Sequence, residues 1–285
     1  MEFVAFHVGL GIDQAVHPNQ TLEHENYLSM IDMMFASVRL FHPKAVRVML
    51  SDRSTSFDRI HSRLDRLIRG DVDGSRLMLE RTRAQWLYVQ ASAFEQPIVM
   101  LDSDILINES LAPVFQRSFD VALTWRENDE QPVNGGLMIL NNQRPEMVRR
   151  FFEKFMSIYQ EQYAEGQAAW FGDQLALRDC LGLKLKEFSR QDVIEVDGCR
   201  VLLLPCDIYN FSPDNRYEEI ADGLPGKRVL HFKGERKRLM GPFWRAWLRP
   251  RHSWIPWVLY RAWRERAWLK QQQKVEVRQV RGGKK

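Results

Sequence analysis

Long apolar runs are absent from this sequence: no stretch reaches the roughly 18–20 residues that a membrane-spanning helix requires. The first residues also lack the basic segment of a secretory signal peptide. The only three cysteines, Cys180, Cys199 and Cys206, lack metal-ligand spacing and leave an odd thiol in any pairing. These absences predict a reduced, cytoplasmic location.

The composition is otherwise that of a globular protein, with 45% hydrophobic and 27% charged residues. Its 285 residues are enough for a large core, in one sizeable domain or two small ones. The net charge of +4 hides an asymmetry. Residues 233–285 hold 16 Lys and Arg against 3 Asp and Glu (+13), and the rest hold 25 against 34 (−9). The sequence therefore predicts a mildly acidic body with a strongly basic tail.

Two carboxylates follow a short apolar run in the middle of the chain. Ile98–Leu101 can fill a fully buried parallel strand, and Asp102 and Asp104 come where that strand would leave the sheet. Side chains at i and i+2 share one face, so both carboxylates can face one point. Open α/β sheets bind ligands at this edge, and carboxylates there suit a hard divalent cation that also binds substrate phosphates. The stretch predicts a metal site.

A second Asp-x-Asp pair shows that the spacing alone is not specific. Asp71 and Asp73 are followed by Gly74, which is typical of a surface turn. The hydrophobic strand that precedes Asp102 is what favours the metal site over a solvated turn at the first pair.

Strand patterns and helix patterns alternate along the chain. We expect strands at 3–10, 45–50, 98–101, 119–125, 137–140, 183–188, 193–196, 201–204 and 229–232, and a loop at 131–136. Helices are expected from a cap at Thr21 to His42, and at 57–69, 77–93, 145–163 and 172–180. The alternation predicts an α/β fold with a parallel, doubly wound sheet.

Four short motifs occur in an order that resembles one enzyme family. They are Asp102-Ser103-Asp104, Val133-Asn134-Gly135-Gly136, Gly172-Asp173-Gln174 and His231-Phe232-Lys233-Gly234-x-x-Lys237. Over residues 1–240 the chain resembles the retaining nucleotide-sugar glycosyltransferases of the glycogenin and lipopolysaccharide-galactosyltransferase type. The resemblance implies their GT-A fold, a Rossmann-like, mixed and mostly parallel sheet flanked by helices.

The same resemblance implies a metal site made by Asp102, Asp104 and His231. The implied cofactor is Mn²⁺ or Mg²⁺, and the imidazole favours Mn²⁺ because histidine is a borderline ligand. The alternative role for His231 is a structural residue at a strand end.

A donor-binding set is implied as well, and it contains Arg83, Asp102, Ser103, Gly234 and Lys237. Gly234 would let the backbone approach the diphosphate, and Lys237 would supply a point charge to it. Arg83 would contact the nucleotide sugar, and its alternative is a solvated helix charge. After Lys237 the chain has Arg-Leu where the family commonly has Pro-Trp, a departure that bears on the geometry of this lysine.

The catalytic set implied by the resemblance is Asn134, Asp173 and Gln174, which would face the donor sugar and its anomeric carbon. Asn134 has the alternative of a loop residue in a left-handed conformation, and Asp173 that of a helix N-cap. His7, Gly9 and Gly11 would border the nucleobase and ribose.

The predicted function is metal-dependent transfer of a sugar, with retention, from a nucleotide-diphosphate sugar to a saccharide or lipid-linked acceptor. The cation and Lys237 would stabilise the leaving diphosphate. A nucleotidyltransferase of related fold is one alternative, although the short loop Gly9-Leu10-Gly11 carries no basic residue. A non-catalytic membrane-binding or nucleic-acid-binding adaptor is another, but it leaves the three metal-ligand candidates unexplained.

Six tryptophans lie among arginines and lysines within residues 243–270. Tryptophan favours the headgroup level of a membrane and basic residues favour anionic lipid, so we expect this segment to bind an anionic membrane surface. The protein would then be peripheral at the inner membrane face. Packing on the body ranks second and nucleic acid third. We expect a catalytic domain at 1–240 and a helical tail at 241–285, with disorder over 271–285.

Overall fold

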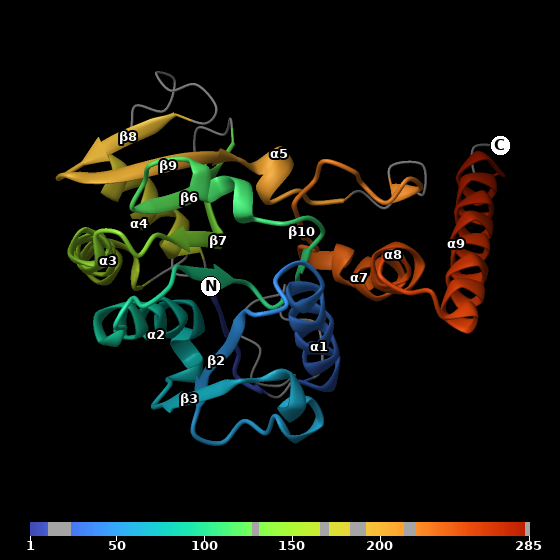
Figure 1. Cartoon of the computed structure of the whole chain (residues 1–285), viewed down its shortest axis with the longest axis horizontal. Coiled ribbons are helices and arrows are strands. Elements are labelled where there is room, and N and C mark those ends of the chain that lie inside the picture. Colours follow the sequence, from blue (N-terminus) through green and yellow to red (C-terminus); the bar gives the residue numbers. More distant parts are fainter. Residues whose placement is uncertain (11–23, 127–130, 166–170, 183–191, 214–219, 283–285) are drawn as a thin grey trace.

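A central eight-stranded sheet organises the protein, which is described here by a computed structural model (Figure 1). The structure describes residues 1–10, 24–126, 131–165, 171–182, 192–213 and 220–282. The strand order is β3-β2-β1-β4-β7-β6-β9-β8. In chain order these strands are β1 (Glu2–Phe6), β2 (Val46–Asp52), β3 (Arg66–Gly70), β4 (Ile98–Leu101), β6 (Val121–Trp125), β7 (Val133–Leu140), β8 (Val193–Val196) and β9 (Cys199–Pro205).

The sheet is mixed, with a parallel half that carries the predicted metal site. The pairs β3–β2, β2–β1, β1–β4 and β6–β9 are parallel, whereas β4–β7, β7–β6 and β9–β8 are antiparallel. All four residues of β4 and all eight of β7 are buried, as expected for strands covered on both faces.

Helices cover both faces of this sheet. One face packs against α1 (His24–Phe41) and α7 (Lys237–Phe243), and the other against α2 (Leu77–Ala91), α3 (Pro145–Ile158) and α4 (Gly172–Leu181). Adjacent strand residues alternate between the two layers: Leu101 joins the first core and Met100 the second. The expectation of a mixed α/β sheet flanked by helices is confirmed.

A second, two-stranded sheet brings the end of the chain to the metal-site motif. Strand β5 (Ile105–Ile107) pairs antiparallel with β10 (Val229–His231), and His231 lies opposite Ile105. The amide of Phe232 also donates to the carbonyl of Asp104, at 2.9 Å. This register fixes His231 beside Asp104, although 126 residues separate them in the sequence.

Two expected elements differ in the structure. The helix expected at 57–69 is a 3-10 turn at Asp58–Arg63 followed by strand β3, because residues 66–70 pair with β2 at the sheet edge. The loop expected at 131–136 is mostly strand, since β7 begins at Val133 and a bulge keeps it paired with β6. Thr21, Gly11 and the strand expected at 183–188 lie outside the described residues.

The tail begins inside the core and ends outside it. Phe243 and Trp247 are buried among the residues that pack on the first sheet face. After the short helix α8 (Arg249–Arg251), helix α9 (Pro256–Gly282) extends to the side of the body (Figure 1). It covers most of the segment for which composition predicts disorder. A short helix, α5 (Cys206–Tyr209), follows β9.

Candidate active site

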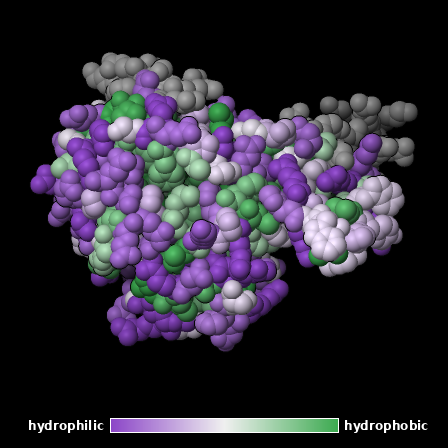
Figure 2. Space-filling model, viewed as in Figure 1, coloured by the Kyte–Doolittle hydropathy of each residue, from purple (hydrophilic) through white to green (hydrophobic). Residues whose placement is uncertain are grey.

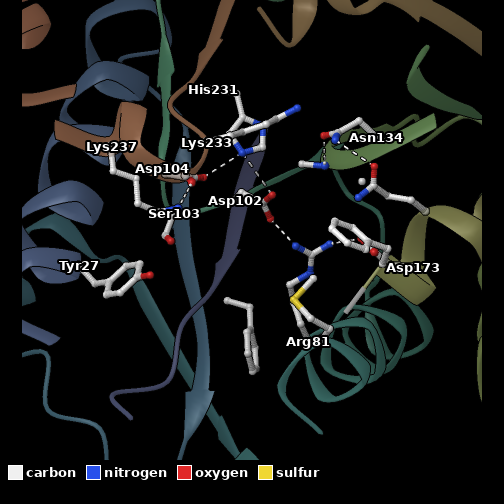
Figure 3. A pocket seen from close by; sticks show the side chains of 17 residues that line it. Tyr27, Arg81, Asp102, Ser103, Asp104, Asn134, Asp173, His231, Lys233 and Lys237 are labelled. Atoms are coloured by element: carbon white, nitrogen blue, oxygen red, sulfur yellow. Dashed lines mark hydrogen bonds and ion pairs between the residues drawn. The ribbon is translucent and has the colours of Figure 1, made fainter. Parts of the chain in front are cut away.

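A cavity of about 240 Å³ opens at the carboxyl end of β4, where β4, β7 and β10 meet (Figure 3). It is lined by polar and charged side chains from segments far apart in the sequence. They include Tyr27, Arg81, Asp102, Ser103, Asp104, Asn134, Asp173, Gln174, His231, Lys233 and Lys237. Ligand sites at this edge are the rule for open α/β sheets.

Three candidate metal ligands converge in this cavity. Nε2 of His231 lies 3.0 Å from Oδ1 of Asp104 and 3.6 Å from Oδ2 of Asp102. One ligand atom from each residue falls within 4.8 Å of the others. Two ligands at right angles around an ion at about 2.1 Å are themselves about 3 Å apart, so these separations suit one shared cation.

The orientation of His231 is set by Asn210, which lies behind it. Nδ1 of His231 is 2.8 Å from Oδ1 of Asn210. The amide nitrogen of Asn210 donates to Oγ1 of Thr124 at 2.9 Å and to Oδ1 of Asn134 at 2.7 Å, so its oxygen must face the histidine. The oxygen accepts a hydrogen bond from the N–H of Nδ1, which leaves Nε2 to face the carboxylates.

This arrangement fits a divalent ion. In the neutral tautomer the lone pair of Nε2 points at a carboxylate oxygen 3.0 Å away, so a cation or a proton must lie between them. Two carboxylates and an imidazole form a donor set for ions such as Mn²⁺, and an outer partner like Asn210 is what a metal-binding histidine normally has.

Two cations hold the carboxylates from either side. Arg81 bridges Oδ1 of Asp102 at 2.6 Å and Oδ2 of Asp173 at 2.7 Å. Nζ of Lys237 lies 3.0 Å from Oδ2 of Asp104. Burial alone would raise the pKa of Asp104, but His231, when Nε2 carries a proton, and Lys237 hold it well below its ordinary value. Asp104 therefore stays ionised in the cavity.

Strand β7 approaches the histidine so closely that it needs glycine. A Cβ atom on Gly136 would lie 2.5 Å from Cε1 of His231, and one on Gly135 would lie 2.7 Å from Oδ2 of Asp173. The amide of Gly136 donates to Oδ1 of Asn134 at 3.0 Å. The two glycines thus let the backbone, the metal-ligand candidates and the predicted sugar-facing residues meet in one place.

The solved structures that the chain resembles are glycosyltransferases. The glycosyltransferase GlyE of Streptococcus pneumoniae matches with a TM-score of 0.52 and 16% identity, over 95% of this chain and 64% of GlyE. The galactosyltransferase LgtC, solved with donor and acceptor sugar analogues, gives a TM-score of 0.49 and 13% identity, over 86% of this chain and 95% of LgtC. No known family model and no curated protein matches the sequence.

The fold is that of a GT-A-type glycosyltransferase. The GT-A expectation is therefore confirmed for the architecture. Within this fold, nine of the ten residues predicted for the metal, donor-binding and catalytic sets lie in the one cavity: Asp102, Ser103, Asp104, Asn134, Asp173, Gln174, His231, Gly234 and Lys237. Gly234 has a φ of +55°, a left-handed conformation that favours glycine.

Arg83 is the predicted site residue that the structure does not bring to the cavity. It lies beside Glu80 and lines a separate hollow between α2 and β3. Arg81, two residues earlier on the same helix, points into the site instead, because two residues turn a helix by about 200°. His7 contacts His24 at 3.1 Å and, like Gly9, does not line the cavity.

Besides Arg81, Asn210 behind the site and Lys233 in it were not singled out by the sequence. Asn210 follows α5 and belongs to no motif, so only the tertiary structure places it behind His231. Lys233 lies inside the late motif, at one of its variable positions, and its side chain lines the cavity.

Proposed function

We propose that this chain is a metal-dependent glycosyltransferase that moves a sugar from a nucleotide-diphosphate sugar to a saccharide or lipid-linked acceptor. One observation carries the proposal. Asp102, Asp104 and His231 converge at the carboxyl end of β4, in a fold shared with solved glycosyltransferases. A hard cation held there would be positioned to bind the diphosphate of a donor.

The residues around this group divide the work of donor binding. Asp102, Asp104 and His231 would hold Mn²⁺ or Mg²⁺, which when bound supplies positive charge to the diphosphate oxygens. Lys237 offers a second positive charge from the Asp104 side, and the left-handed Gly234 exposes backbone to the same region. These contacts stabilise the negative charge that develops as the sugar–phosphate bond breaks.

The opposite side of the cavity is suited to the sugar. Nδ2 of Asn134 donates to Oε1 of Gln174 at 3.2 Å, and Asp173 is held by Arg81. Oδ1 of Asp173 is buried and has no side-chain hydrogen-bond partner among the described residues. Burial raises the pKa of Asp173, against the effect of Arg81.

We infer retention of configuration, as in the family that the motifs resemble. The acceptor hydroxyl would then attack the anomeric carbon from the face that the diphosphate leaves. The sugar would pass through an oxocarbenium-like state. Asn134, Asp173 and Gln174 would orient the sugar so that this face meets the acceptor.

The test is a panel of nucleotide sugars with Mn²⁺, in which released nucleoside diphosphate is measured with and without acceptor. We expect turnover with at least one donor, loss of turnover with a chelator, and a fall of about 100-fold or more in Asp104→Asn. Asp71→Asn is the matched control, because Asp71 belongs to the exposed Asp-x-Asp pair. Its carboxylate forms an exposed ion pair with Arg53, away from the cavity. Turnover of Asp104→Asn at the wild-type rate would contradict the metal role.

The same panel separates the alternatives when a reaction with a nucleoside triphosphate and a sugar phosphate is added to it. A nucleotidyltransferase would release pyrophosphate from a nucleoside triphosphate and a sugar phosphate, and would not release nucleoside diphosphate from a nucleotide sugar. A non-catalytic adaptor would release neither product.

We also propose that α9 binds an anionic membrane surface, which would make the enzyme peripheral at the inner membrane face. Among described residues no helix is long and apolar enough to span a bilayer. Val258, Ala262 and Leu269 face the body, whereas Trp257 and Trp268 are about half exposed on a neighbouring side of the helix. In Figure 2 this projection is mainly white and purple, in keeping with tryptophans beside basic residues.

Charge and aromatic side chains act together on that face. The guanidinium of Arg261 lies over the ring of Trp257, and that of Arg264 over the ring of Tyr260. Basic residues near an anionic surface contribute about 1 kcal/mol each, and this attraction weakens as salt rises. Since Phe243 and Trp247 are buried, deletion of the whole tail would damage the core.

Substitutions therefore test membrane binding better than deletion. Arg261→Glu with Arg264→Glu should release the protein from anionic vesicles at low salt, measured by co-sedimentation. Arg53→Glu with Arg59→Glu is the charge-matched control on exposed parts of the body. If the wild-type protein stays in the supernatant with anionic vesicles at low salt, the membrane proposal is wrong.

A further inference from the structure

A second hollow, of about 490 Å³, lies between α1 and the turn that joins α8 to α9. Helix α8 lies between α1 and α9 (Figure 1). The ring of His252, at the end of α8, packs edge-on against the ring of Phe41, with centroids 5.0 Å apart. This contact holds the end of α8 on α1, so the hollow is formed without a ligand. Its size is in the range of small-molecule sites.

The charged side chains that line this hollow are mostly basic. They are Arg39, Arg63 and Arg249, against one carboxylate, Asp32, among the described residues. Nε of Arg63 lies 2.6 Å from Oδ1 of Asp32, so the carboxylate is already paired. The guanidinium groups of Arg39 and Arg249 have neither an ion pair nor a hydrogen bond within the part of the chain that the structure describes. The lining therefore carries two positive charges without a counterion.

The surroundings of the hollow do not neutralise these two arginines. Asp65 lies close enough for Arg47 and, more weakly, Arg39 to lower its pKa, but its carboxylate is bound by Arg47 at 2.8 Å. The guanidinium of Arg249 lies over the ring of Trp257, 5.5 Å from its centroid. Stacking of this kind leaves the in-plane N–H donors of an arginine free to bind oxygen. The hollow is thus complementary to an anion with several oxygens, such as a phosphate group.

The rim of the hollow is apolar and exposed. Trp254 is 88% exposed and Ile255 is 39% exposed, and both lie in the segment between α8 and α9. Ile255 also lines the hollow, together with the buried Val258. Neighbouring apolar side chains exposed in this way are typical of an interaction site, and tryptophan favours the headgroup level of a bilayer.

We propose that this hollow binds the phosphodiester headgroup of an anionic phospholipid. Arg39 and Arg249 bind the phosphate oxygens, and the acyl chains leave past Trp254 and Ile255. The inference rests on the proposed membrane binding of α9 and deepens it by naming the ligand and its site. The exposed apolar rim favours a lipid over free phosphate, because free phosphate would leave that rim in water.

The hollow is separate from the candidate active site. Tyr27 lines the active-site cavity and Ala36 lines the hollow, both from α1. At about 1.5 Å per residue they stand about 14 Å apart along the helix. Substitutions in the hollow should therefore leave nucleotide-sugar turnover in solution unchanged.

A titration with lipid monomers tests the ligand. Dioctanoyl phosphatidylglycerol is added below its micelle concentration and binding is followed by tryptophan fluorescence. Glycerol 3-phosphate and dioctanoyl phosphatidylcholine are the comparison ligands. We expect phosphatidylglycerol to bind at least tenfold more tightly than either. Equal binding of glycerol 3-phosphate would assign the hollow to free phosphate, and equal binding of phosphatidylcholine would reduce it to an apolar contact; both results overturn the proposal.

Matched variants place the lipid in the hollow. Arg39→Met with Arg249→Met should lower the affinity for phosphatidylglycerol at least tenfold, and both side chains are exposed, so the fold should be kept. Arg53→Met with Arg59→Met removes the same charge from exposed parts of the body and should change this affinity by less than twofold. Wild-type affinity in the first pair, or an equal loss in both pairs, would overturn the proposal.

Vesicle co-sedimentation separates this inference from the membrane proposal on which it rests. If the wild-type protein stays in the supernatant with phosphatidylglycerol vesicles at low salt, membrane binding fails and the inference fails with it. If the protein sediments but the lipid monomers show no headgroup preference, only the assignment of the hollow is wrong.

Discussion

Gly136→Ala is the perturbation whose effect on the site can be worked out most fully. The new Cβ would lie 2.5 Å from Cε1 of His231, 2.8 Å from Nδ1 of the same ring and 2.9 Å from Oδ1 of Asn134. Strand β7 cannot yield easily, because it is fully buried and paired with β4 and β6 on its two edges. The His231 ring must therefore move.

The size of that movement decides the effect on the metal. Ordinary contact between two carbon atoms needs about 3.5 Å, so the ring must retreat by about 1 Å. Ligand distances in metal sites hold to about 0.2 Å, and disturbing the support of a ligand costs roughly 10–100-fold in affinity. Overpacking of this kind also lowers stability by about 1–3 kcal/mol.

The measurement is Mn²⁺ affinity in the presence of nucleoside diphosphate, together with the free energy of unfolding. We expect Gly136→Ala to weaken Mn²⁺ binding by roughly 10–100-fold, as changes to the residues that support a metal ligand do. Gly70→Ala is the control, since a Cβ atom at that strand position meets nothing within 4 Å. Wild-type Mn²⁺ affinity in a folded Gly136→Ala protein would refute the idea that His231 is a ligand held against β7.

Three further changes test other parts of the site and fold. Asn210→Ala should weaken Mn²⁺ binding by about 10–100-fold, measured by titration, because His231 loses the partner of its Nδ1. Arg81→Met should lower nucleotide-sugar turnover by at least about tenfold while Arg83→Met leaves it unchanged, since only the first bridges two site carboxylates. Asp120 is buried, which alone would raise its pKa, but its two arginine partners hold that pKa below the ordinary value. Its contribution is thus present above the unfolded pKa of about 3.9 and lost as pH falls through the lower folded pKa. Asp120→Asn should then cost about 1–2 kcal/mol in urea unfolding at pH 7, with a smaller difference in acid, because the two arginines left behind are about a third exposed and can be hydrated.

The sequence was most informative where one short run of residues was enough to predict an element of the structure. The apolar run before Asp102 predicted β4, and its two carboxylates lie in the cavity at the end of that strand. Motif resemblance added His231, although the register of β10 against β5 that brings it there could not be predicted from either segment alone.

Helix α2 shows why the sequence favoured Arg83 for donor binding, although it is Arg81 that lines the cavity. Its buried face contains Glu80, Arg81, Thr82 and Gln85, so polar residues occupy positions that hydrophobic spacing would assign to solvent. With no apolar stripe to fix the helical phase, Arg81 and Arg83 were indistinguishable.

Long-range pairing explains the other differences. Residues 66–70 become a strand only because β2 lies beside them, and Asn210 reaches His231 only after α5 and β10 are placed. Pairing partners and outer-layer contacts of this kind leave no local pattern in the sequence. The tail was ambiguous for a similar reason, since Trp247 is buried whereas Trp254 is 88% exposed.

The central claim is that Asp102, Asp104 and His231 hold a divalent ion that in turn holds a nucleoside diphosphate. The most direct test is an equilibrium titration with Mn²⁺, in which electron paramagnetic resonance measures the bound ion, run with and without nucleoside diphosphate. The two ligands should strengthen each other by the same factor, as linkage requires, and Asp104→Asn should abolish this coupling. Mn²⁺ binding that is indifferent to the nucleotide, or unchanged in Asp104→Asn, would contradict the account.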